Sequence, residues 1–219
     1  MPSLFEPSRP TVLLYDWDNT LVDAWAGIAA ALNAAFTAFS LPLWTVQDTR
    51  NRVRVSLRES FPVMFGAEWE RARDIFYTTL TEGHLDAVTP MPGAREALTA
   101  GAGWIQGVVS NKAGAFLRKE VTHLGWDPHF GAVVGAGDAH ADKPDPAPIL
   151  LALQRLGRAP DFSVWYMGDT AVDMQAARAA GVRAILIGDA EHDGGVEQAA
   201  PDIHFPSAHH FASRLRELE

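Results

Sequence analysis

Short apolar runs that end in polar or acidic residues recur along this chain, and they constrain its fold more than any other feature. The runs lie at residues 11–15, 105–109, 164–167 and 183–187. Such runs are typical of strands that are buried on both faces of a parallel sheet. Helical patterns alternate with them, at residues 113–124, 147–156 and 172–180. The alternation predicts a doubly wound α/β core with a parallel, Rossmann-like sheet and right-handed crossovers.

The segment between the first two runs contains no convincing strand. Its apolar spacing predicts three helices, at residues 24–39, 46–61 and 67–80. Thr45 and Asp48 have the spacing of a capping box that opens the second of these helices. We therefore predict an inserted α-helical cap at residues 23–88 and an α/β core formed by residues 1–22 and 89–219.

Composition excludes several classes of function. The formal charge is −9, which disfavours a surface built for nucleic acid or for an anionic membrane. The absence of cysteine excludes a disulfide framework, a thiolate nucleophile and a cysteine-ligated metal. No apolar stretch reaches the roughly 20 residues that span a membrane, and the N-terminus lacks an apolar signal segment. We expect a cytoplasmic protein, monomeric or homodimeric, that binds neither nucleic acid nor membrane.

The strongest motif is DWDNT, which directly follows the first apolar run and carries Asp16 and Asp18. Open α/β sheets bind their ligands at the carboxyl ends of their strands, where this motif falls. In a tightening turn, two carboxylates at positions i and i+2 can surround one site. Asp, Asn and Thr are also ordinary turn residues, so the motif alone does not establish a function.

Three further segments carry polar side chains next to predicted strands or helices. Ser110 and Asn111 follow the second run, where a hydroxyl and main-chain amides can hold phosphate oxygens. Lys143 precedes a proline-rich helix start and can neutralise phosphate charge. Asp169 and Asp173, four residues apart, can face one metal ion if a helix begins between them. Each feature alone is also typical of a turn, a loop charge or a helix cap, but together they favour phosphoryl chemistry.

The order DWDNT, SN, K and GDxxxD resembles the motifs of the haloacid dehalogenase-like superfamily of hydrolases. The helical insertion is similar to the small cap of its phosphoglycolate-phosphatase-like members. The resemblance implies that Asp16 is the nucleophile and Asp18 the general acid and base. It also implies Mg²⁺, held by Asp16, the main-chain carbonyl of Asp18 and Asp169, with Asp173 supporting the metal. A carboxylate, an oxygen-ligated dication and one lysine suffice for phosphoryl transfer, which depends on positioning and charge neutralisation.

The same resemblance implies that Ser110 and Asn111 bind the transferring phosphoryl group and that Lys143 steadies both that group and the nucleophile. Two positions depart from the family's pattern. Trp17 is bulkier than usual between the two aspartates, and Asn19 stands where glycine is commoner. We expect these departures to affect the shape of the substrate and not the reaction.

Arginines recur every four residues in the predicted cap, at Arg50, Arg54 and Arg58. On one helix they would share a face, either as a solvated stripe or as a site for an anion. Arg54 is the best candidate to bind a substrate carboxylate, because its guanidinium donates in a bidentate fork. This contact would favour phosphoglycolate among small phosphorylated metabolites.

Other activities use the same core residues. A sugar-phosphate phosphatase, a phosphoglucomutase-like enzyme and an inorganic pyrophosphatase all remain open, and so does a catalytically silent binding module on the same fold. A haloacid dehalogenase does not need Asp18, because halide leaves without a proton. A phosphonoacetaldehyde hydrolase would need a lysine in the cap, and residues 24–90 contain none.

Overall fold

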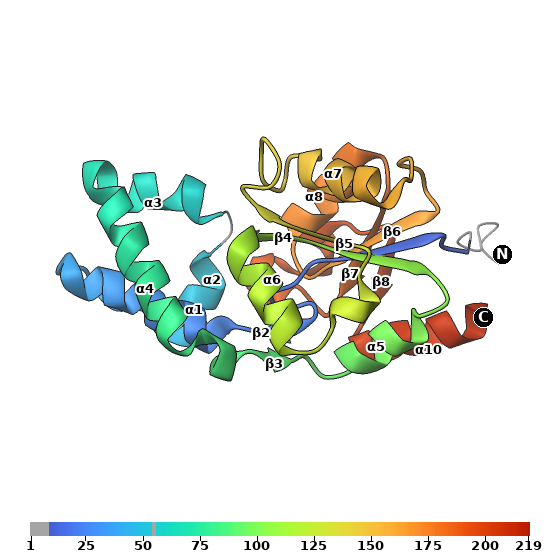
Figure 1. The fold of residues 1–219 in the computed structure, drawn as a ribbon, viewed down its shortest axis with the longest axis horizontal. Helices are drawn as coiled ribbons and strands as arrows, with labels where there is room; N and C mark the ends of the chain where they lie inside the picture. Colours follow the sequence, from blue (N-terminus) through green and yellow to red (C-terminus); the bar gives the residue numbers. More distant parts are fainter. Residues whose placement is uncertain (1–8, 54–55) are drawn as a thin grey trace.

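A six-stranded sheet forms the centre of the protein (Figure 1), in the computed structural model that describes residues 9–53 and 56–219. Its order is β5-β4-β1-β6-β7-β8, and every neighbouring pair is parallel. The strands are β1 (Val12–Tyr15), β4 (Ile105–Ala113), β5 (Ala132–Ala136), β6 (Val164–Gly168), β7 (Arg183–Ile187) and β8 (Ile203–Phe205). The prediction of a doubly wound α/β core is confirmed.

Helices cover both faces of this sheet (Figure 1). They are α5 (Ala94–Ala100), α6 (Gly114–His123), α7 (Ala147–Leu156), α8 (Ala171–Ala180), α9 (Gly195–Ala199) and α10 (Ala208–Leu218). Leu13 and Tyr15 of β1 belong to the apolar core shared with α5, α6 and α10. Val12 and Leu14 belong to the core shared with α7 and α8. Because side chains alternate along a strand, the continuous apolar run of β1 supplies both cores.

The two edge strands, β5 and β8, were not predicted from the sequence. β8 has three residues, and β5 contains alanine and glycine beside two valines, so neither forms a distinct apolar run. The strand predicted at residues 105–109 is also longer than expected. β4 continues through Ser110 and Asn111, with a register shift against β5 between Val109 and Ala113.

The helical insertion leaves the core and returns to it through a two-stranded antiparallel pair, β2 (Val22–Asp23) and β3 (Thr89–Pro90). Between these strands lie α1 (Trp25–Ala38), α2 (Val46–Arg52), α3 (Leu57–Phe65) and α4 (Trp69–Ala87). The insertion has its own apolar core, which includes Phe36, Phe61 and Phe76. The domain boundaries at residues 22/23 and 88/89 stay a prediction, and the β2–β3 pair lies at this position.

The helix predicted at residues 46–61 is wrong, because the chain forms two helices there. Thr45 and Asp48 make the predicted capping box of α2, but α2 ends at Arg52. Ser56, in an extended conformation, then takes the N-cap position of α3, although its side chain makes no capping hydrogen bond. Arg50 and Arg58 therefore lie on different helices and do not form one stripe. Arg54 lies outside the described residues.

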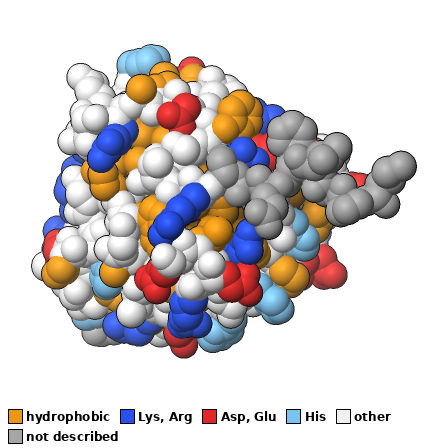
Figure 2. Space-filling view, turned by 90° about the vertical axis from the view of Figure 1, so that its right-hand side faces the viewer, with side chains coloured by type: hydrophobic (Ala, Val, Ile, Leu, Met, Phe, Trp, Pro, Cys, Tyr) orange, Lys and Arg blue, Asp and Glu red, His pale blue; other side chains and the backbone are white. Residues whose placement is uncertain are grey.

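In the part of the chain that the structure describes, the end of the core that carries the C-terminus shows no basic face (Figure 2). In Figure 2, lysine and arginine side chains on this end are interspersed with aspartate and glutamate. Among the described residues, no helix combines the length and the apolar character needed to cross a bilayer.

Candidate active site

The turn after β1 places Asp16 at the carboxyl end of the central strand. Its amide donates to the carbonyl of Met167 at 2.7 Å, and the chain then reverses through a hydrogen bond from the Asn19 amide to the Val22 carbonyl at 2.6 Å. Asn19 has a φ of 66°. Asparagine tolerates this left-handed conformation better than other non-glycine residues, which accounts for its place in the motif.

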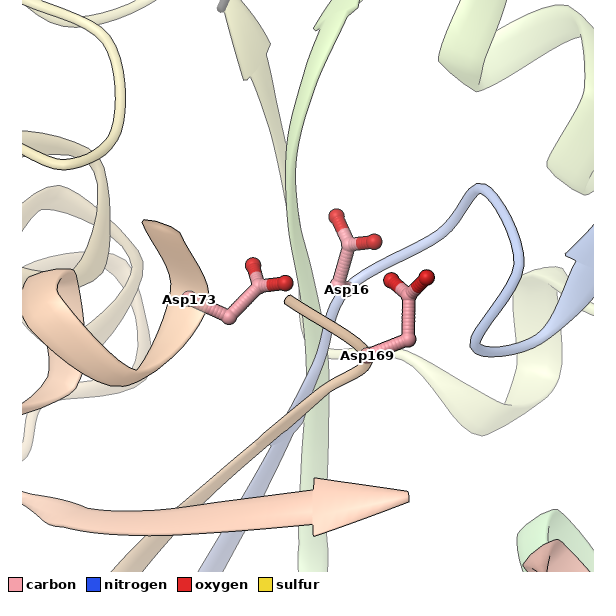
Figure 3. Close-up of side chains that lie close together, drawn as sticks. All are labelled: Asp16, Asp169 and Asp173. Carbon is pink, nitrogen blue, oxygen red and sulfur yellow. The ribbon is translucent and has the colours of Figure 1, made fainter. Parts of the chain in front are cut away.

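Three buried carboxylates meet beside this turn (Figure 3). Asp16 follows β1, Asp169 follows β6, and Asp173 lies in the first turn of α8. Each offers an oxygen, and these oxygens lie within 4.8 Å of one another. Asp169 Oδ2 is buried and lies 3.4 Å from His192 Nε2. Carboxylate oxygens are the ligands that hard dications prefer, so this group of side chains fits Mg²⁺.

Lys143 lies next to two of these carboxylates. Its ammonium donates to Asp16 Oδ1 at 2.6 Å and to Asp173 Oδ1 at 2.7 Å, and its side chain is 4% exposed. It also donates to the hydroxyl of Tyr166 at 2.9 Å, and that hydroxyl donates to the carbonyl of Val109. Burial raises the pKa of Tyr166 well above its ordinary value, so the phenol keeps its proton.

The charges of this site do not balance within the protein. Burial raises the pKa of Asp16, and the carboxylates of Asp173 and Asp169 raise it further, against the lowering effect of Lys143. Burial lowers the pKa of Lys143, but Asp16 and Asp173 raise it more, so the amine stays charged. One ammonium therefore faces three buried carboxylates, and a bound dication would neutralise the excess negative charge.

Magnesium is expected to stabilise the folded protein. At a concentration of about 100 times its Kd, a ligand that binds only the folded state contributes about 2.7 kcal/mol. For a chain of this size that corresponds to a rise in Tm of about 5 to 11 °C. Asp169→Asn should reduce the rise to below about 2 °C, because it replaces a charged ligand by a neutral one. Thermal unfolding with and without Mg²⁺ measures both values.

The matched control for this measurement is Asp161→Asn, an exposed aspartate outside the carboxylate group. It should keep the full rise in Tm. An equal rise in the Asp169 variant would mean that Mg²⁺ binds elsewhere on the protein.

The other predicted core residues also lie around this site, and each of them has hydrogen-bond partners within the protein. Ser110 is buried, and its hydroxyl accepts from the amide of Lys112 at 3.1 Å. The side chain of Asn111 bonds the main-chain amide and carbonyl of Lys143, each at 2.9 Å. The amide nitrogen of Asn111 carries a second hydrogen, which can donate to a phosphate. The carboxylate of Asp18 lies outside the carboxylate group and accepts from Lys112 at 2.7 Å.

A cavity of about 180 Å³ lies between the core and the insertion. The core side contributes the candidate catalytic side chains, and the insertion contributes mostly apolar ones, among them Ile28, Leu57, Phe76 and Leu80. Trp17 does not line the cavity and is fully buried in the core. The expectation that Trp17 affects the shape of the substrate stays a prediction, and any such effect would have to pass through neighbouring residues.

Two contacts hold the insertion over this cavity. The ring of Tyr77 on α4 stacks on Phe116 of α6, with centroids 4.9 Å apart. Arg58 on α3 pairs with the buried Asp142 at 2.9 Å, directly before Lys143 in the chain. Arg58 is therefore engaged with the core and is not part of a solvated stripe.

Sequence reasoning missed several side chains that line or support the site. Tyr166 falls within an apolar run, where a tyrosine gives no sign of a polar role. Lys112 directly follows Ser110 and Asn111, and this adjacency was a usable signal. His192, in the short helix η3 (Glu191–Asp193), places Nε2 3.4 Å from Asp169 Oδ2, although the two residues are far apart in sequence.

Several known proteins are similar to this chain in sequence or in structure. A phosphoglycolate phosphatase from Pectobacterium atrosepticum is 30% identical over 203 residues, covering 87% of this chain and 86% of the relative. An N-acetylmuramic acid 6-phosphate phosphatase from Pseudomonas aeruginosa is 31% identical, covering 82% of each chain. A crystal structure described as a predicted phosphoglycolate phosphatase from Haemophilus somnus has a TM-score of 0.81, at 21% identity over 96% of this chain and 98% of the other.

At 21% identity, the likeness to the Haemophilus somnus structure shows the fold alone. A haloacid dehalogenase-like hydrolase from Bacteroides fragilis has the same TM-score, 0.81, at 25% identity over 92% of this chain and 99% of the other. The family model described as haloacid dehalogenase-like hydrolase matches residues 13–187, a range that includes Asp16, Lys143 and Asp169. The chain therefore belongs to the haloacid dehalogenase-like hydrolase family.

Proposed function

We propose that this protein is a Mg²⁺-dependent phosphatase that hydrolyses a small phosphorylated metabolite through an aspartyl phosphate on Asp16. The observation that carries the proposal is the meeting of Asp16 with Lys143 and Asp169 beside a cavity lined by Ser110. The names of the curated relatives also support a phosphatase. Cytoplasmic location, and a monomer or homodimer, stay predictions from the sequence.

The proposed reaction has two halves. An oxygen of Asp16 attacks the phosphorus, the bond from phosphorus to the leaving oxygen breaks, and Asp18 donates a proton to that oxygen. Asp18 then takes a proton from water as the water oxygen attacks the phosphoaspartate, which releases phosphate and restores Asp16. Mg²⁺, held by Asp16, the main-chain carbonyl of Asp18 and Asp169, would neutralise charge on the phosphoryl oxygens.

The remaining core residues bind and orient in this proposal. Ser110, Asn111 and the main-chain amides beside them hold phosphoryl oxygens, and Lys143 pairs with both Asp16 and the phosphoryl group. Asp173 supports the metal indirectly. One of its oxygens bonds Lys143, and the other accepts from the hydroxyl of Thr170 at 2.6 Å.

We propose phosphoglycolate as the substrate, with a phosphorylated sugar acid as the second candidate. Both follow from the names of relatives that cover four fifths or more of this chain. Each name describes a phosphate ester of a carboxylic acid. Phosphate release should be measured with Mg²⁺ on phosphoglycolate, N-acetylmuramic acid 6-phosphate, glucose 6-phosphate, nitrophenyl phosphate and pyrophosphate. We expect the highest kcat/KM on one of the two acids, and a preference for pyrophosphate would contradict the proposal.

Arg54 is proposed to bind the substrate carboxylate. Arg54→Ala is expected to raise KM for phosphoglycolate by about one to two decades, because a charge-assisted hydrogen bond contributes about 1.5 to 3 kcal/mol. It should change KM for nitrophenyl phosphate little, since that substrate has no carboxylate. Arg52→Ala is the matched control, because Arg52 does not line the cavity and its guanidinium packs over Trp44. If the Arg54 variant handles both substrates as the wild type does, this proposal is wrong.

A further inference from the structure

A buried hydrogen-bonded network of three side chains, Trp17, Glu120 and Lys112, connects the core to Asp18. The proposed reaction assigns none of the three a role. The indole Nε1 of Trp17 donates to Glu120 Oε2 at 2.6 Å. The ammonium of Lys112 donates to both oxygens of Glu120, at 2.7 and 2.8 Å, and to Asp18 Oδ1 at 2.7 Å. The three side chains come from the turn after β1, from β4 and from α6.

The end of this network that lies in the core is held rigidly. Trp17 is 0% exposed, and its ring packs edge to face against Trp126 with centroids 5.6 Å apart. Glu120 has a side chain that is 1% exposed, and it receives three hydrogen bonds from Trp17 and Lys112. A carboxylate that is buried in this way cannot move without leaving its donors unpaired.

The other end of this network reaches the cavity. The side chain of Lys112 is 7% exposed and that of Asp18 is 19% exposed, and both residues line the cavity. An ammonium has three hydrogens, and the three bonds of Lys112 account for all of them. With two carboxylates on one ammonium, the cluster has no uncommitted positive charge for a phosphate. Lys112 is therefore suited to hold Asp18 and unsuited to bind the phosphoryl group.

We propose that Lys112, fixed by Glu120 and Trp17, is a positioning residue that orients the Asp18 carboxyl group for proton transfer at the leaving oxygen. The inference rests on the proposed function, in which Asp18 is the general acid and base. It gives the unusual Trp17 of the DWDNT motif a reason, because a smaller residue there would leave Glu120 without its indole donor. The indole thereby acts on the reaction through two intervening side chains.

The test compares an alkyl phosphate, which has a poor leaving group, with nitrophenyl phosphate, whose leaving group needs little protonation. Lys112→Met should lower kcat on the alkyl phosphate about 10- to 100-fold, since a misplacement of about 1 Å can cost a factor of about 100. It should lower kcat on nitrophenyl phosphate less than about 3-fold and leave KM nearly unchanged. Trp17→Phe should show the same selectivity with a smaller loss. Lys119→Met, an exposed lysine on α6, is the matched control and should leave both substrates unaffected.

Two further variants separate the possible outcomes. In an Asp18→Asn background, Lys112→Met should cause no additional loss on the alkyl phosphate, because there is no longer an acid to orient. The double variant Lys112→Met/Glu120→Gln removes both buried charges, so it should fold and still show the selective loss.

Suppose that Asp18→Asn selectively slows the alkyl phosphate, but Lys112→Met and the double variant slow both substrates equally. The positioning role of Lys112 is then overturned, while the proposed function stands. If Asp18→Asn itself slows both substrates equally, the acid and base assignment of the proposed function fails, and the positioning role fails with it.

Discussion

Asp16→Asn is expected to lower kcat by at least about 10⁴-fold, a loss of the size seen when a nucleophile is removed from other covalent enzymes. The substitution removes the attacking oxygen and one charged metal ligand. The fold should persist, because asparagine has nearly the same volume and Lys143 keeps its bond to Asp173. Steady-state phosphate release measures the loss, and thermal unfolding checks the fold.

A trapping experiment gives an independent readout of the same prediction. Wild-type enzyme that is quenched in acid during turnover should retain covalently bound phosphate, and the Asp16 variant should retain none. Asp161→Asn, the exposed control, should behave as the wild type in both assays. A variant of Asp16 that keeps more than about 1% of the wild-type kcat would contradict the covalent mechanism.

Lys143→Met is expected to have the largest effect on stability. Methionine fills much of the space of the lysine, but the buried carboxylates of Asp16 and Asp173 lose their shared ammonium. Breaking a buried ion pair by removing one partner costs about 3 to 5 kcal/mol in the free energy of unfolding. For a chain of this size, the fall in Tm is about 6 to 20 °C. Activity should be lost as well, because the phosphoryl group loses its only proposed side-chain cation.

The pH dependence of this variant tests the electrostatic cause. Burial already raises the pKa of Asp16 in the wild type, and removal of Lys143, which lowers it, raises it further. A carboxylate with a raised folded pKa contributes stability below its unfolded pKa of about 3.9 and loses it as pH rises through the folded pKa. The stability deficit of Lys143→Met should therefore grow as pH rises above the folded pKa that Asp16 has in the wild type. Lys143→Met/Asp173→Asn should recover part of the loss, and a deficit that is independent of pH would point to packing instead.

The sequence alone determined the central architecture and part of the candidate site, namely Asp16, Lys143, Asp169 and Asp173. β1, β4, β6 and β7 are buried over most of their length, so each contains a largely apolar stretch. In a parallel sheet the carboxyl ends of the strands share one edge, and Asp16 and Asp169 therefore had to lie near one another. The capping box of α2 and the helix α7 were also predicted correctly, because caps and apolar spacing are local properties of the chain.

Only the tertiary structure decided what each polar side chain bonds. Lys112 meets Asp18 across 94 positions of the chain, and Trp17 meets Glu120 across 103. It also decided that Arg58 pairs with Asp142, and that Arg50 lies on another helix. Periodicity reports which face of an element is buried, but it carries no information on which distant element covers that face. The partners of a buried lysine or glutamate follow from the packing of crossover connections, so they could not be read from local sequence.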